Sequence, residues 1–170
     1  MKVKVMKTHP NAVLPKKAYP SDYCYDCVAV TEEEVAPDVW KYGLGLAFQV
    51  ERDFETVCES MSCNRGIVKS YPTKVDFSRS PINLSIDVRP RSSVYKTGMV
   101  LSNCVGTVDE NYIGEVSAVF YHVKKDMPRY RVGQKVCQIK LGTSFPMKFE
   151  VVDSLAGTDR GSGGYGSTGK

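Results

Sequence analysis

Short stretches in which apolar and polar side chains alternate recur along most of this 170-residue chain. An alternation with a period of two places every second side chain on one face of a β-strand, so each stretch predicts a strand with one buried face. Turn-forming residues separate the stretches, which is typical of a β-sandwich or a β-barrel. The predicted strands cover residues 2–7, 23–30, 42–50, 84–88, 115–123, 135–141 and 148–152, with Met99-Val100-Leu101 as a further short buried strand.

The expected fold is therefore all-β, made of short strands with at most one short helix. Residues 94–96 could form a single helical turn, whereas Trp40 and the acidic run 32–34 are interpreted as ordinary loop residues. The chain is long enough for one domain with a sizeable core. Its hydrophobic content of 42% and charged content of 25% are typical of a globular protein.

Two segments depart from the alternating pattern. Residues 51–82 are polar, mixed in charge and without clear periodicity, so we interpret them as an insertion between strands. Residues 157–170 are rich in glycine and contain no apolar side chain beyond Tyr165, so they cannot pack on their own. The predicted organisation is one β-domain over 1–156, which carries the insertion, followed by a flexible tail over 157–170.

Charge and hydropathy argue against several classes of partner. The net charge is only +4 and no run of Lys or Arg exceeds two residues, whereas a nucleic-acid surface normally shows a clustered basic stripe. No stretch approaches the roughly 20 apolar residues of a membrane helix, and the first residues do not resemble a signal peptide. We therefore expect no nucleic-acid or membrane partner, a cytoplasmic location, and six cysteines that are reduced thiols.

The segment 89–115 concentrates polar chemistry at both ends of its short apolar strand. A guanidinium and hydroxyls bind phosphate, a carboxylate can orient a water molecule, and a carboxamide can pair with the edge of a base. This spacing suits a nucleoside triphosphate, although each residue taken singly is also typical of a surface turn. The residues concerned are Arg91, Ser92 and Ser93 before the strand, and Asn103, Asp109 and Tyr112 after it.

Several segments resemble the motifs of trimeric dUTP diphosphatases, in the family's order. They are P-R-S-S at 90–93, N-C-V-G-T-V-D-E-N-Y-I-G-E at 103–115, V-G-Q-K-V-C-Q at 132–138 and R-G-S-G-G-Y-G-S-T-G at 160–169. In addition, Y-C-Y-D-C at 23–27 falls where the family has A-G-Y-D-L. The resemblance implies a β jelly roll, a homotrimer with sites shared between subunits, and hydrolysis of dUTP to dUMP and pyrophosphate. Such an enzyme controls the level of dUTP and supplies dUMP.

The resemblance also implies a role for each candidate residue. Asp109 activates the water that attacks the α-phosphorus, and Ser92 helps pyrophosphate to leave. Asn103 and the main chain at Gly106 recognise uracil, and Tyr112 lies flat against the deoxyribose. The residues that contact the phosphates are Arg91, Ser93 and Gln138. The triphosphate brings Mg²⁺, which Asp26 holds through water.

The glycine-rich tail resembles two different phosphate-binding devices. Its last residues satisfy most of the phosphate-loop pattern, but the sequence ends at Lys170 without the required hydroxyl residue or a following helix. The resemblance instead implies a lid that closes over bound substrate. In this lid Arg160 reaches the γ-phosphate, Tyr165 stacks on the base, and donors to the phosphate come from Gly164, Gly166, Ser167 and Thr168.

Two other functions stay open at this point. A dCTP deaminase shares this fold and some motifs, but it needs a group that activates water against the base, and no glutamate in the 103–115 run has that context. A regulatory protein could use the insertion at 51–82 as a surface for a protein partner. Cys58 and Cys63 provide only two of the four ligands that a zinc site needs. A cellular or a viral origin is equally compatible with the sequence.

Overall fold

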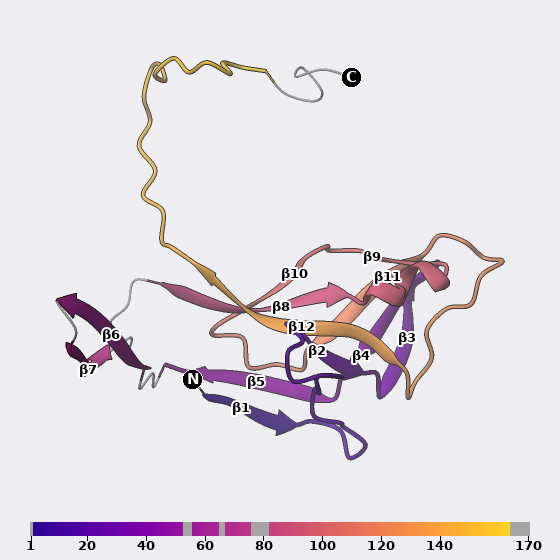
Figure 1. Ribbon diagram of the computed structural model, residues 1–170. Helices are drawn as coiled ribbons and strands as arrows, with labels where there is room; N and C mark the ends of the chain where they lie inside the picture. The colour runs from indigo at the N-terminus through magenta and orange to yellow at the C-terminus, as the bar shows by residue number, and fades with distance from the viewer. Residues whose placement is uncertain (1, 53–55, 65–66, 76–81, 164–170) are drawn as a thin grey trace.

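The computed structural model describes residues 2–52, 56–64, 67–75 and 82–163, and its paired strands are antiparallel (Figure 1). One four-stranded sheet has the order β10 (Gly106–Asp109), β8 (Asn83–Pro90), β12 (Lys135–Ser144) and β2 (Tyr25–Val28). The other has the order β3 (Thr31–Ala36), β4 (Val39–Gly43), β11 (Ser117–His122) and β9 (Met99–Leu101). Both contribute to one hydrophobic core, so they form a β-sandwich.

Two further strand pairs complete the described fold. β1 (Lys2–Lys7) pairs with β5 (Leu46–Glu51), and β6 (Thr56–Asn64) pairs with β7 (Ile67–Val75). A 3-10 helix, η2 (Ser92–Lys96), follows β8 at the place where the sequence allows a helical turn. The all-β jelly-roll prediction is therefore confirmed. Among the described residues no helix is long and apolar enough to cross a membrane.

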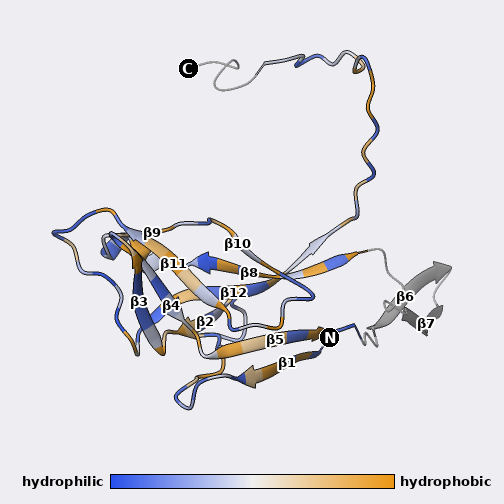
Figure 2. Cartoon of the chain, turned by 180° about the vertical axis from the view of Figure 1, so that it is seen from behind, coloured by the Kyte–Doolittle hydropathy of each residue, from blue (hydrophilic) through white to orange (hydrophobic). Residues whose placement is uncertain are grey.

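Aromatic side chains form the centre of the core. Tyr42 of β4, Phe120 of β11 and Tyr130 pack edge to face, with ring centroids 5.4 to 6.1 Å apart. Figure 2 shows hydrophobic residues along β9 and β11, the strands on this side of the core. The Tyr42 hydroxyl donates a hydrogen bond of 2.9 Å to the carbonyl oxygen of Tyr130, so its polar end has a partner inside the core.

β8 is the strand that connects the core to the polar outer face. Leu84, Ile86 and Val88 are buried in the core, whereas the residues between them point to the other side of the sheet. β8 pairs with β10 on one side and with β12 on the other. On its outer face the Asp87 carboxylate forms an ion pair with the Lys140 ammonium of β12, at 3.0 Å. The outer face is therefore the polar surface of this sheet.

The predicted strand at 42–50 is wrong in its extent, because the chain forms two strands there. Gly45 interrupts them with φ +64°, and a side chain at this position would lie within 2.8 Å of atoms of His9 and Val30. Glycine alone tolerates both the left-handed backbone and the close neighbours. The interruption lets β4 pair with β11 while β5 pairs with β1.

Residues 31–43 form a hairpin, so the interpretation of Trp40 and the run 32–34 as loop residues is wrong. β3 and β4 pair there, and the Arg129 guanidinium lies 3.4 Å from the centroid of the Trp40 ring. Arg129 also donates to Glu32 at 3.0 Å. This arrangement could not be predicted from local sequence, because Arg129 is far along the chain from Glu32 and Trp40.

The segment interpreted as an insertion, 51–82, contains the β6–β7 hairpin, which pairs only with itself among the described strands. The strand predicted at 148–152 is wrong. Residues 148–152 do not form a strand, and residues 145–152 continue beyond β12 as an extended stretch away from the sheets (Figure 1). Their alternating pattern finds no neighbouring strand to pair with in the described part of this chain.

Candidate functional site

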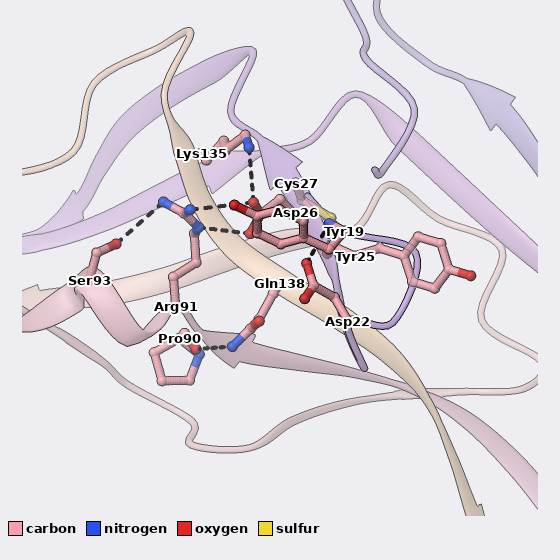
Figure 3. A network of polar contacts seen from close by, with 10 residues as sticks. All are labelled: Tyr19, Asp22, Tyr25, Asp26, Cys27, Pro90, Arg91, Ser93, Lys135 and Gln138. Carbon is pink, nitrogen blue, oxygen red and sulfur yellow. Dashed lines mark hydrogen bonds and ion pairs between the residues drawn. The ribbon is translucent and has the colours of Figure 1, made fainter. Parts of the chain in front are cut away.

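Asp26 is the centre of a polar network on the outer face of the first sheet (Figure 3). Its carboxylate accepts hydrogen bonds of 2.8 and 3.3 Å from the Arg91 guanidinium and one of 3.0 Å from the Lys135 ammonium. Arg91 also donates to the Ser93 hydroxyl at 3.3 Å. The side chains come from β2, from the residues after β8 and from β12, so the network joins three segments that are distant in sequence.

The electrostatics of the network keep Asp26 ionised. Burial of the Asp26 side chain raises its pKa, but the hydrogen bonds and charges of Arg91 and Lys135 more than offset this effect. The pKa of Asp26 therefore lies below its ordinary value. At neutral pH this corner of the sheet presents one carboxylate between two cations.

Gln138 and Ser92 stand beside this network. The Gln138 amide donates a hydrogen bond of 2.8 Å to the carbonyl oxygen of Pro90, and Gln138 pairs with Asp26 in the β2–β12 ladder (Figure 3). Ser92 is exposed at the first position of η2, directly after Arg91. The structure thus brings together Asp26, Arg91, Ser93 and Gln138, with Ser92 adjacent in the chain. A guanidinium, an ammonium and hydroxyl groups are donors that suit phosphate oxygens.

Asn103 and Gly106 lie together where β9 leads into β10. A side chain at Gly106 would lie 3.1 Å from the Asn103 amide nitrogen, so glycine is what allows the carboxamide to approach the main chain here. Tyr112 follows the end of β10, and its hydroxyl donates to the carbonyl oxygen of Glu115 at 3.1 Å. Its ring is about half exposed. A flat ring and a carboxamide therefore stand on the same short segment.

Asp109 is the last residue of β10, and it is exposed. It lines an open cavity of about 1000 Å³ on the outer face of the sheet. The tyrosine at position 112 closes the following turn, because its backbone N–H donates to the Asp109 carbonyl oxygen at 3.0 Å. Other polar residues that line this cavity are Ser85, Asp87, Arg89, Thr107, Glu110 and Lys140.

Asp26 and Asp109 lie at opposite corners of the first sheet. Asp26 pairs with Gln138 at one edge, and Asp109 pairs with Ser85 at the other. Gly142, which also pairs with Ser85, is four residues from Gln138 on β12. Three interstrand spacings of about 4.8 Å and four residues of about 3.4 Å place the two aspartates roughly 20 Å apart. They are too far apart for both to serve one phosphate group.

The described tail residues, 157–163, lie apart from these groups (Figure 1). Arg160 is exposed, and its guanidinium donates to the carbonyl oxygen of Gly163 at 2.9 Å. The predictions for Gly164, Tyr165, Gly166, Ser167 and Thr168 fall outside the described residues.

Comparison with known proteins identifies the family. The family model described as dUTPase matches residues 56–169. The deoxyuridine 5'-triphosphate nucleotidohydrolase of Gloeothece citriformis is 30% identical to this chain over 170 residues, which are 99% of this chain and 97% of the relative. The chain belongs to the dUTPase family. A second relative of the same name, from Picosynechococcus, is 27% identical over 99% of both chains.

Solved structures of dUTPases share the fold of this family member. The Staphylococcus bacteriophage 80alpha dUTPase with dUPNHPP has a TM-score of 0.67 and 16% identity, and the match covers 99% of both chains. The dUTPase from phage phi11 of S. aureus, solved as a mutant with a structural Mg(II) ion, has a TM-score of 0.62 and 13% identity over 92% of this chain and 100% of that chain. At these identities the likeness concerns the fold.

Two charged residues in these clusters of the dUTPase were not predicted from the sequence. Lys135 belongs to the Asp26 network, and its position three residues before Gln138 in the V-G-Q-K-V-C-Q segment is the signal that could have found it. Glu110 follows Asp109 and accepts two hydrogen bonds of 2.6 Å from Arg52. No sequence signal points to Arg52, because it lies at the start of the insertion and is separated from Glu110 by 58 positions in the chain.

The residues around Asp26 are compatible with a triphosphate-bound Mg²⁺. Among the described residues no group of three or more His, Cys, Asp or Glu side chains could hold a metal ion alone. Mg²⁺ usually keeps several waters and binds one or two carboxylates together with substrate phosphates. A single ionised carboxylate beside cations that suit phosphate oxygens fits that mode, so Asp26 is the residue that would hold such an ion.

We expect Asp26→Asn to destabilise the fold in a pH-dependent way. Since the folded-state pKa of Asp26 is lowered, its ion pairs stabilise the protein above the unfolded-state pKa of about 3.9 and are lost as the pH falls through the folded value. At pH 7 the variant should lose about 1–3 kcal/mol. Thermal unfolding between pH 7 and pH 3 should show the difference from wild type shrinking below about pH 4.

Asp38→Asn is the matched control, because Asp38 forms an exposed ion pair with Lys125 elsewhere on the surface. Exposed pairs contribute about 0–1 kcal/mol, so this variant should unfold nearly like wild type at every pH. An Asp26→Asn deficit that stays constant down to pH 3 would contradict the ionised network.

Proposed function

We propose that this chain hydrolyses dUTP to dUMP and pyrophosphate, which removes dUTP and supplies dUMP. The observation that carries the proposal is the cluster around Asp26 of Arg91, Ser93 and Gln138, three residues that lie within the region matched by the dUTPase family model. The names of the relatives support the same substrate. The chemistry below assigns one task to each of these groups.

Asp109 orients and deprotonates the attacking water. Its exposed carboxylate sits at the end of a paired strand, which gives a general base a fixed position facing an open cavity. The water oxygen attacks the α-phosphorus, its proton passes to the Asp109 carboxylate, and the bond from the α-phosphorus to the bridging oxygen breaks. The products are dUMP and pyrophosphate.

Arg91 and Ser92 stabilise the leaving pyrophosphate. The guanidinium offers a planar pair of donors, and the serine hydroxyl donates to a phosphate oxygen as charge accumulates there. Ser93 and Gln138 hold further phosphate oxygens from the same corner of the sheet. The hydrogen bond of 2.8 Å from Arg91 to Asp26 fixes the orientation of the guanidinium that would meet these oxygens.

Uracil and deoxyribose are selected on the segment after β9. The Asn103 carboxamide offers a donor and an acceptor, which match the acceptors and the N3–H of uracil. Cytosine would leave these groups unpaired, and unpaired buried polar groups discriminate strongly between substrates. The Tyr112 ring packs against the sugar and leaves no room for a 2′-hydroxyl.

Asp26 would hold Mg²⁺ through water. The ion would supply positive charge that neutralises the triphosphate. The structural Mg(II) ion of the phage phi11 dUTPase supports the presence of this metal in the family.

A complete site needs more than one copy of the chain, and we assign it to a homotrimer. The separation of roughly 20 Å between Asp26 and Asp109, derived from strand spacing and register, means that the attacking carboxylate comes from one copy and the phosphate cluster from another. Closed symmetric assemblies are the usual way in which identical chains share sites.

The stretch after β12 supports this association. Its alternating apolar side chains are 72–99% exposed at Phe145, Met147, Phe149 and Val151. Figure 2 shows orange and blue alternating along this part of the chain, which extends away from the sheets. An alternating segment that has no partner strand in the described part of its own chain suits contact with a second copy.

Residues 157–170 act as a lid over the occupied site. In this proposal Arg160 contacts the γ-phosphate, and Tyr165 stacks on the base. Gly164, Gly166, Ser167 and Thr168 supply donors to the phosphates. The glycines give the segment the freedom that closure requires, and the domain proper ends near residue 156.

The proposal also includes a cytoplasmic location and a role of the 51–82 insertion in binding a protein partner. Cys24, Cys27, Cys104 and Cys137 are free thiols, which suits a reducing cytoplasm. Cys27 pairs with Cys137 across β2 and β12, and a hydrogen bond from Cys137 together with burial raises the pKa of the Cys27 thiol. Binding of a protein partner by the 51–82 insertion stays a prediction.

The first test measures pyrophosphate release from dUTP, dCTP, dTTP and UTP. We expect efficient turnover of dUTP alone. The Asn103 contact discriminates against dCTP and the Tyr112 contact against UTP, whereas dTTP offers the same hydrogen-bonding edge and sugar and must be excluded by the bulk of its 5-methyl group. Asp109→Asn should lower kcat by about 10²–10⁴-fold, the usual contribution of a general base, while leaving binding of a non-hydrolysable dUTP analogue intact. Release of ammonia from dCTP would instead identify a deaminase and overturn the proposal.

Mixed assembly tests whether sites are shared. Asp109→Asn and Ser92→Ala chains should each be nearly inactive alone, because each lacks one half of every site. Co-refolded at equal amounts, random trimers should recover about a quarter of the wild-type sites, since each site needs one intact group from each of two copies. A mixture no more active than its separate components would place the whole site on one chain.

Removal of residues 159–170 tests the lid. We expect kcat/KM for dUTP to fall by about 10²-fold or more because the closing donors are lost. The circular-dichroism signal of the sheets and the thermal unfolding midpoint should match those of the full-length chain. Full activity of the shortened chain would refute the lid.

A further inference from the structure

Glu110, the residue next to the attacking carboxylate, joins three separate parts of the chain. Its carboxylate accepts hydrogen bonds of 2.6 Å from both the Nε and an Nη atom of Arg52. The same carboxylate accepts a hydrogen bond of 3.3 Å from the backbone N–H of Leu84. Arg52 directly follows β5, and Leu84 is the second residue of β8. The contacts therefore connect the turn after β10 to both ends of the inserted segment.

The ion pair between Arg52 and Glu110 has the bidentate geometry of a strong ion pair. A bidentate guanidinium–carboxylate pair fixes orientation as well as distance. Both side chains are about three-quarters buried, and the hydrogen bonds from Arg52 are the largest cause that lowers the pKa of Glu110, with burial acting in the opposite direction. Glu110 thus stays ionised and paired at neutral pH.

The turn that follows Asp109 makes few packing contacts that could fix its position. Asp109, Asn111, Tyr112 and Ile113 are all exposed, so apolar packing contributes little there. β10 is an edge strand and its ladder with β8 ends at the pair of Asp109 and Ser85. The carboxylate of Glu110 is the side chain that fastens this turn from the outside.

We propose that Glu110 is a positioning residue for the hydrolytic reaction, which holds Asp109 in place through Arg52 and the Leu84 amide. This inference rests on the proposed function, since it assigns Asp109 as the general base. A catalytic base displaced by about 1 Å can lose about 10²-fold in rate, although the substrate still binds. The role therefore shows itself in kcat and much less in KM.

The experiment compares steady-state hydrolysis of dUTP by wild type, Glu110→Ala, Glu110→Gln and Arg52→Lys, all full-length. We expect Glu110→Ala to lower kcat by about 10–100-fold with KM changed by less than about threefold. Glu110→Gln keeps an acceptor oxygen for Arg52 and Leu84 and should recover most of the loss. Arg52→Lys keeps the charge but loses the bidentate geometry, so it should fall between the two.

Glu33→Gln is the matched control, because Glu33 forms an ion pair of 2.8 Å with Lys41 on the other sheet. It should keep wild-type kcat. Thermal unfolding and binding of a non-hydrolysable dUTP analogue are measured for every variant. Glu110→Ala should bind the analogue like wild type and unfold at a moderately lower temperature, because the Arg52 guanidinium loses this carboxylate. Wild-type kcat in Glu110→Ala would overturn the inference. So would a loss of kcat that is matched by an equal loss of analogue binding.

The wild-type chain in the same assay separates this inference from the one on which it rests. A wild type inactive toward dUTP would overturn the proposed function and, with it, the role of Glu110. An active wild type beside a fully active Glu110→Ala would overturn the positioning role alone.

Discussion

The alternation along β8 is the constraint on which the rest of this structure depends. Leu84, Ile86 and Val88 enter the core, so the residues between them must face outward, and a shift of one residue would reverse every side chain. Because β8 pairs with both β10 and β12, its register also sets where Asp109 and Gln138 emerge. The apolar face thus determines the placement of the polar one.

Local patterns were sufficient for much of the fold. The period-two segments at 84–88 and 135–141 lie within strands of the sandwich. The family motifs pointed to Asp26, Arg91 and Gln138, which the structure brings together from segments distant in sequence. The strand predictions rest on side chains whose burial the neighbouring residues already indicate. A strand with one buried face can be predicted from the alternation of its own apolar and polar side chains.

The failures share a physical cause, which is a partner distant in sequence. Trp40 was assigned to a loop because its cation neighbour, Arg129, stands in another part of the chain. The strand expected at 148–152 has the right alternation but no edge to pair with in the described part of one copy. Glu110 gained significance only when the fold brought Arg52 beside it. Alternation of apolar and polar residues predicts that one face of a strand is buried, but it does not predict which part of the protein covers that face.

The joined ends of the insertion have a consequence for how this chain can diverge. Since Arg52 and Leu84 meet at one carboxylate, the span between them is closed independently of its content. The entropy of closing a loop grows slowly, by about 0.6 kcal/mol for each doubling of length. Evolution can therefore lengthen, trim or rewrite that span at small thermodynamic cost, while the neighbouring edge of the sandwich keeps its shape.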